Sequence, residues 1–122
     1  MISYDDYNAF CGSLPAATHV VQWGGAHVWK VGGKVFAIGG WSKGDFPYVT
    51  FKCTEIAFEM LKEEPGLRPA PYLAPRGGKW IQMYDEPGLS DEDLKKYIAA
   101  SHRLVAQKLT RKLRAELNLE DL

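Results

Sequence analysis

Ser101 and His102 place a nucleophile beside a base in this chain. A hydrolytic centre needs a hydroxyl, a base within hydrogen-bond reach and a third group that orients the base. The surrounding sequence has a helical pattern, and neighbouring residues on a helix point about 100° apart. The imidazole is therefore poorly placed to accept the serine proton, and we expect a non-enzymatic protein.

The residues that usually bind metals are dispersed along the chain. His19, His27 and His102 lie far apart, and Cys11 and Cys53 have no further thiol nearby. Metal ligands commonly recur at short intervals, such as four residues along one helix face. We therefore expect neither a metal nor another cofactor.

Glycine spacing suggests a phosphate-binding loop only in part. Gly39 and Gly44 have the internal spacing of that motif, but Asp45 and Phe46 stand where it needs lysine and a hydroxyl residue. An anionic side chain at that position would repel phosphate. We interpret these glycines as turn residues.

Basic and aromatic residues form the strongest chemical signal. Ammonium and guanidinium groups contact phosphates, and exposed aromatic rings stack on bases. Trp80 has two open interpretations, because an indole also packs well inside a sheet. The candidate nucleic-acid-binding residues are Lys52, Arg68, Tyr72, Arg76, Lys79 and Trp80, with further cations at Arg103, Lys108, Arg111, Lys112 and Arg114.

The diglycine Gly32-Gly33 predicts a tight hairpin turn between two strand-like runs. With these two residues as the loop, Lys30 would face Val35 and Trp29 would face Phe36. The predicted aromatic pair lies on one side of a sheet.

The remaining periodicity predicts the other elements. We expect an N-terminal helix over residues 3–12 and strands over 19–23, 27–31, 34–39, 48–52 and 79–83. A second helix of about ten residues starts at Thr54, and a proline-rich segment, 67–75, allows at most an edge strand. A long helix begins at Ser90 and runs past Leu109; Leu113 and Leu117 either continue it or form a separate terminal turn. The order predicts an α+β fold, an antiparallel meander covered by helices on one face.

Composition limits the class of protein. The 122 residues suit a single domain, 1–122, and fifteen basic residues balance fifteen acidic ones. No overall field draws the chain to a polyanion, so such binding needs a local patch. Two separate cysteines, no basic leader and no long apolar run favour a cytoplasmic protein without membrane contact. We also expect a monomer.

Several segments in order resemble the small MmcQ/YjbR-like proteins. They are residues 30–37, 51–53, 66–70, 79–80, 101–105 and 108–109. The resemblance implies a double-wing, frataxin-like (CyaY-like) α+β fold and DNA binding, and it places Lys52 and Lys79 as phosphate contacts and Trp80 as a stacking group. Residues 71–74 read Pro-Tyr-Leu-Ala where many members have Tyr-His-Leu-Asn, and Gly77-Gly78 is inserted.

Three functions follow as hypotheses. The first is a non-enzymatic, bacterial-type protein that binds DNA or another nucleic acid through a local basic and aromatic patch. The second is a protein- or peptide-interaction module that uses an edge strand or the Trp80 region. The third, frataxin-like metal handling, rests on fold analogy, and the first helix offers only Asp5 and Asp6 as an adjacent acidic pair.

Overall fold

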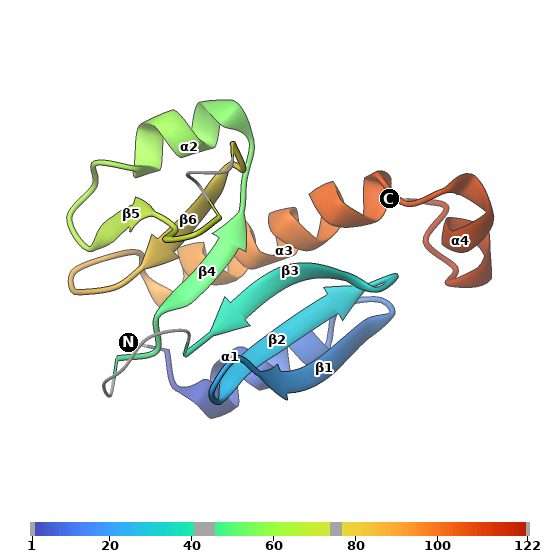
Figure 1. The fold of residues 1–122 in the computed structure, drawn as a ribbon, viewed down its shortest axis with the longest axis horizontal. Helices are drawn as coiled ribbons and strands as arrows, with labels where there is room; N and C mark the ends of the chain where they lie inside the picture. Colours follow the sequence, from blue (N-terminus) through green and yellow to red (C-terminus); the bar gives the residue numbers. More distant parts are fainter. Residues whose placement is uncertain (1, 41–45, 74–76, 122) are drawn as a thin grey trace.

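A six-stranded antiparallel sheet organises the protein. The computed structural model describes residues 2–40, 46–73 and 77–121. The strand order is β1-β2-β3-β4-β6-β5, and α1 and α3 pack against one face (Figure 1). The elements are α1 (Tyr4–Gly12), β1 (Ala17–Gln22), β2 (Ala26–Val31), β3 (Lys34–Gly39), β4 (Val49–Lys52), α2 (Glu55–Leu61), β5 (Leu67–Pro69), β6 (Trp80–Met83), α3 (Asp91–Gln107) and α4 (Arg111–Glu116). The predicted α+β fold is confirmed.

Hydroxyl side chains start the first three helices at the predicted places. Ser3, Thr54 and Ser90 each accept a hydrogen bond from the backbone N–H three residues later, at 3.1 Å. These bonds satisfy donors that the helix itself leaves unpaired. The sequence signals for helix starts were therefore accurate.

The long helix ends earlier than its pattern predicts. It stops at Gln107, so the expected extension past Leu109 is wrong, and the separate terminal turn is the alternative observed. Leu109 is buried against the β2–β3 turn, and Thr110 then accepts a bond from the Leu113 N–H to start α4. The helix thus ends just before the leucine that packs on the hairpin turn.

The hairpin register differs from the prediction at one residue. Lys30 pairs with Val35 as expected, but Trp29 pairs with Ala37, so the predicted Trp29–Phe36 pair is wrong. Phe36 is the extra residue of a β-bulge, a feature that leaves one residue outside the ladder. Both aromatic side chains still enter the same core.

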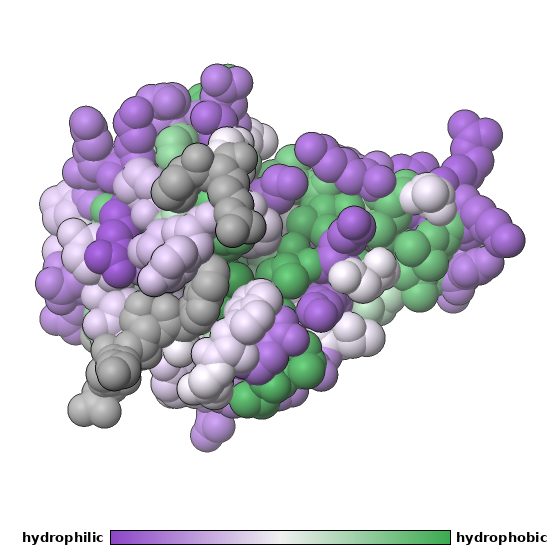
Figure 2. Space-filling model, in the orientation of Figure 1, coloured by the Kyte–Doolittle hydropathy of each residue, from purple (hydrophilic) through white to green (hydrophobic). Residues whose placement is uncertain are grey.

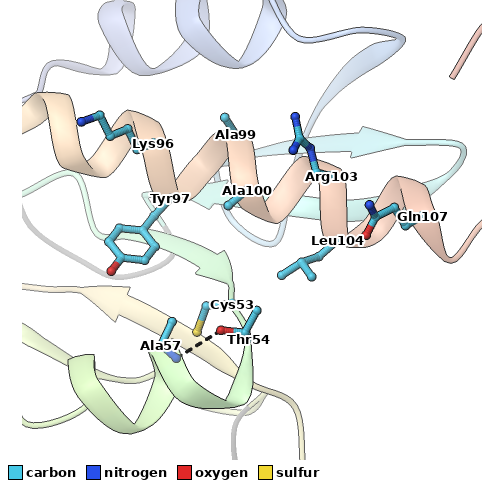
Figure 3. A pocket seen from close by; sticks show the side chains of 10 residues that line it. All are labelled: Cys53, Thr54, Ala57, Lys96, Tyr97, Ala99, Ala100, Arg103, Leu104 and Gln107. Atoms are coloured by element: carbon cyan, nitrogen blue, oxygen red, sulfur yellow. Dashed lines mark hydrogen bonds between the residues drawn. The ribbon is translucent and has the colours of Figure 1, made fainter. Parts of the chain in front are cut away.

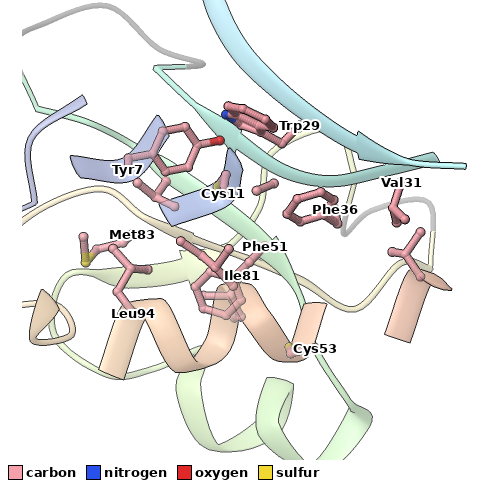
Figure 4. Packing of buried hydrophobic residues seen from close by; sticks show 14 of the residues in the cluster. Tyr7, Cys11, Trp29, Val31, Phe36, Phe51, Cys53, Ile81, Met83 and Leu94 are labelled. Atoms are coloured by element: carbon pink, nitrogen blue, oxygen red, sulfur yellow. The ribbon is translucent and has the colours of Figure 1, made fainter. Parts of the chain in front are cut away.

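The main core lies between the sheet and the helices. Tyr7 of α1, Phe36, Phe51 and Ile81 of the sheet and Leu94 of α3 are all fully buried there (Figure 4). The Tyr7 hydroxyl also donates to the His27 carbonyl at 3.0 Å. This packing fixes the strands whose ends carry the candidate site.

The opposite face of the sheet is partly covered by the β5–β6 connection. Val28 and Ile38 form a second small cluster with Ala26, and Leu73 packs against it. Because side chains alternate along a strand, this cluster faces away from the main core. After the three-residue strand β5, the chain therefore returns to the sheet at Leu73.

No helix within the described part of the chain combines the length and the apolar character that crossing a bilayer requires.

Candidate functional site

Three lysines from distant parts of the chain surround one cavity of about 400 Å³. Lys34 begins β3, Lys52 ends β4 and Lys108 caps the C-terminus of α3. The other lining residues are Val35, Trp80, Val105 and Leu109. We call this cavity the basic pocket. No carboxylate is among the described residues that line it.

Strand pairing and one glycine bring the basic pocket together. Lys52 and Trp80 are opposite each other on β4 and β6. At the hairpin turn, a Cβ on Gly32 would lie 2.5 Å from a Leu109 methyl carbon, so the backbone sits directly on that side chain. This approach, at a φ of +58°, places Lys34 beside the end of α3.

Ser101 joins β3 and β4 through the backbone of Phe36 and Lys52. Its hydroxyl donates to the Phe36 carbonyl at 2.6 Å and accepts from the Lys52 N–H at 2.9 Å. The β3–β4 ladder is short, with pairs only at Ala37–Phe51 and Ile38–Thr50. A buried helix hydroxyl thus replaces the next rung of the sheet, and it fixes the backbone of Lys52.

The three lysines of the basic pocket have no carboxylate partners among the described residues. Within residues 2–40, 46–73 and 77–121, none of Lys34, Lys52 and Lys108 forms an ion pair. Partial burial, and then the positive charge of Lys108, lower the pKa of Lys52. Both effects penalise the charged ammonium, and the opposite charge of a bound anion would act against them.

Trp80 lies between the two interpretations left open by the sequence. Its side chain is partly buried, and it also lines the basic pocket. A Cβ on Gly78 would lie 2.6 Å from Cδ1 and 3.0 Å from Nε1 of the indole. The indole therefore rests against the bare backbone of the segment that precedes β6.

Figure 2 shows the face of the molecule over which β3 and β4 run. Hydrophobic surface occupies its centre, with hydrophilic side chains set into it, and extends toward α4, whereas the end at α2 is mostly hydrophilic. Apolar and hydrophilic groups thus occur side by side on this face, as they do in the lining of the basic pocket.

The other predicted site residues lie elsewhere. Arg68 donates from Nε and Nη2 to Gln82 Oε1 at 2.9 and 2.7 Å, and its guanidinium lies 4.5 Å from the Tyr84 ring centroid. The Lys79 ammonium lies 5.0 Å from the Phe58 centroid. The structure therefore gathers Lys52 and Trp80 but directs Lys79 toward α2.

Tyr72 and Arg76 belong to the connection between β5 and β6. Tyr72 is 73% exposed. Arg76 lies outside the described residues. Tyr72 is not among the described residues that line the basic pocket.

Two lysines of the basic pocket were absent from the predicted site. Lys34 directly follows the diglycine turn, and Lys108 was considered only as one of several C-terminal cations. No local spacing relates them to Lys52, because the three come together only when the hairpin turn packs on Leu109. In the sequence, the signal that could have indicated Lys34 as a site residue was its position directly after the Gly32-Gly33 turn.

Ser101 and His102 make separate structural bonds. His102 Nε2 lies 2.7 Å from the Pro15 carbonyl, and its ring packs edge-on to Phe36. Burial lowers the pKa of His102, although the Pro15 carbonyl acts in the opposite direction. Each side chain is held by backbone groups rather than by the other, as the helical geometry predicts.

A second cavity, of about 430 Å³, separates α2 from α3 (Figure 3). Its lining is mostly small or apolar, and Lys96 and Arg103 are its charged members. Burial raises the pKa of the Cys53 thiol to about 11, which keeps it protonated at neutral pH. Over the described residues, no group of three or more His, Cys, Asp or Glu side chains could hold a metal ion.

The protein is thus a small α+β protein with one antiparallel sheet and helices packed on one face, and it carries the basic pocket at the ends of its strands. A YjbR family model matches residues 12–104. The chain belongs to the YjbR family, which confirms the resemblance seen in the sequence.

A solved structure shares this fold. The crystal structure of Deinococcus radiodurans protein DR2400, which carries a DUF419 domain, superimposes with a TM-score of 0.84. The match covers 99% of this chain and 91% of that chain at 23% identity. No curated protein matches the chain.

Proposed function

We propose that this protein binds nucleic acid through the basic pocket and acts by binding rather than by catalysis. The observation that carries the proposal is the convergence of Lys34, Lys52 and Lys108 around one cavity, beside Trp80 and with no carboxylate among the described lining residues. Phosphates need such donors, and an aromatic ring offers a surface to bases.

Because the charges of the chain balance, attraction of a polyanion depends on a local cluster of cations such as this one. With fifteen cations and fifteen anions, the molecule as a whole has no net attraction for a polyanion. Two lysines outside the pocket have carboxylate partners: Lys62 lies 2.7 Å from Glu59, and Lys96 lies 3.8 Å from Glu92. Binding energy for phosphates would therefore come from the pocket lysines.

Fluorescence anisotropy with labelled DNA at several salt concentrations tests the proposal. We expect salt-sensitive binding that weakens several-fold in Lys52→Ala and further in the Lys34→Ala/Lys52→Ala double variant. Lys96→Ala is the matched control, since it removes the same charge from an ion-paired position on α3. Absence of binding at low salt, or equal losses in Lys52→Ala and Lys96→Ala, would contradict the proposal.

Lys79 and Arg68 have secondary roles in this proposal. The Lys79 ammonium lies over Phe58, and the Arg68 guanidinium is held by Gln82. Neither group lines the basic pocket. In the same assay we expect Lys79→Ala to weaken binding less than Lys52→Ala.

A second candidate function is recruitment of a peptide or protein by strand addition to β1. β1 is an edge strand that has no Lys, Arg, Asp, Glu or Pro, and Val20 and Val21 are 37% and 53% exposed. The opposite edge, β5, is protected by its three-residue length and by Pro69. Natural sheets usually block an open edge with such devices.

Affinity capture from a nuclease-treated extract separates the two functions. A partner that docks on β1 remains after nuclease treatment, and Val21→Lys removes it because a lysine blocks the edge. A partner bridged by nucleic acid disappears with nuclease and is insensitive to Val21→Lys.

A further inference from the structure

The basic pocket is amphipathic as well as cationic. Four of its lining residues, Val35, Trp80, Val105 and Leu109, are apolar or aromatic. A free phosphate ion would use only the ammonium groups, whereas a nucleotide has an apolar, π-faced base joined to an anionic phosphate. The lining therefore matches both halves of a nucleotide.

The size of the pocket also limits what can enter. Its volume of about 400 Å³ falls in the range of sites for single small ligands. A base inside a duplex is stacked and paired, so it cannot enter a recess without leaving the helix. Proteins that read duplex DNA directly usually insert a projecting helix or strand pair into the major groove. A recess is suited to a base that is already unpaired.

Two contacts hold the walls of the pocket in place before any ligand arrives. The Lys52 backbone is bonded to the buried Ser101 hydroxyl, and the Trp80 indole rests against Gly78. A prearranged wall reduces the ordering cost of binding.

From these observations we infer that the basic pocket accepts one unpaired nucleotide, with its base against Trp80 and its phosphates near the three lysines, so that the protein prefers single strands to duplexes. This inference rests on the proposed function, because it assumes that nucleic acid is the ligand of the pocket.

Anisotropy with three probes tests the inference: a short oligo-dT strand, an abasic strand of the same length and a blunt duplex of the same length. Stacking of one base is lost in the abasic strand, so we expect oligo-dT to bind at least about fivefold more tightly. Oligo-dT should also bind more tightly than the duplex. These comparisons use the unmodified protein and do not depend on the folding of a variant.

Substitutions at Trp80 assign the effect to the indole. Trp80→Ala should lower the affinity for oligo-dT to that for the abasic strand and leave the abasic affinity nearly unchanged. Trp80→Phe should retain most of the preference, because a phenyl ring still offers a stacking face.

The outcomes distinguish this inference from the proposed function. Equal affinity for oligo-dT and the abasic strand, or tighter binding of the duplex, overturns the inference. If Lys52→Ala still weakens the binding of these probes, the proposed function stands even though the inference fails. Failure of all three probes to bind at low salt overturns both.

Discussion

Lys52 links the backbone of the fold to the chemistry of the site. Its N–H is fixed by Ser101, and it lines the basic pocket together with Lys108. Partial burial and the Lys108 charge both lower its pKa. The pKa of Lys52 is therefore a measure of the electrostatics of the basic pocket.

Removal of Lys108 should raise the pKa of Lys52. In Lys108→Ala the repulsion disappears while the partial burial remains, so the pKa should move toward 10.5 without reaching it. Titration of the lysine side-chain carbons by NMR measures the change. Lys96→Ala should leave the Lys52 titration unaltered, and equal shifts in both variants would show that the cause is not local.

His102 should give the folded protein a defined pH dependence. Burial lowers its pKa, so below pH about 6.5 the unfolded chain binds a proton that the folded chain does not. The stability contribution is therefore complete above the unfolded pKa and is lost as pH falls toward the folded one. Urea unfolding at several pH values measures this loss, and His102→Gln should show a shallower decline. An identical decline in both proteins would contradict the assignment.

At the scale of elements, one serine substitutes for a rung of the sheet. Ser101→Ala leaves the Lys52 N–H and the Phe36 carbonyl without their partner. Each unsatisfied buried group costs about 1–3 kcal/mol, so we expect a loss of about 2 kcal/mol or more in the free energy of unfolding. Ser13→Ala is the control, because its hydroxyl also donates to a carbonyl, that of Phe10, but at an exposed site. Comparable losses in the two variants would contradict this role for Ser101.

The hairpin turn offers a second matched pair of variants. Gly32 and Gly33 both have positive φ, at +58° and +81°, but only a Cβ on Gly32 would meet Leu109. Gly33→Ala should cost about 1–2 kcal/mol from backbone strain alone. Gly32→Ala should cost more, because Leu109 must also move, and thermal unfolding compares the two. A smaller loss for Gly32→Ala would show that the turn does not depend on this packing.

At the scale of the whole molecule, balanced charge limits the salt dependence of binding. Each phosphate contact with a single strand contributes about −0.7 to the slope of log affinity against log salt, so three lysines predict a slope of about −2. Lys34→Ala should make the slope shallower by about 0.7. A much steeper slope would indicate that cations outside the basic pocket contribute.

Belonging to the YjbR family and sharing the fold of the Deinococcus radiodurans protein establish the architecture. The lysine cluster is a feature of this chain's own side chains. Function must therefore be tested at those residues, since one fold supports many activities.

The sequence by itself determined the elements whose signals are local. Ser3, Thr54 and Ser90 start helices because a hydroxyl can reach the backbone three residues later, and Gly32-Gly33 turns the chain because glycine tolerates positive φ. The alternation between these signals was enough to predict an antiparallel meander with helices.

Only the tertiary structure decided the register and the site. The bulge at Phe36, the end of α3 at Gln107 and the gathering of Lys34 with Lys108 all depend on contacts between residues far apart in the chain. Leu109 on Gly32 and Ser101 between β3 and β4 make those contacts. Local patterns do not encode them, because each requires two surfaces that meet only after the sheet and α3 have packed.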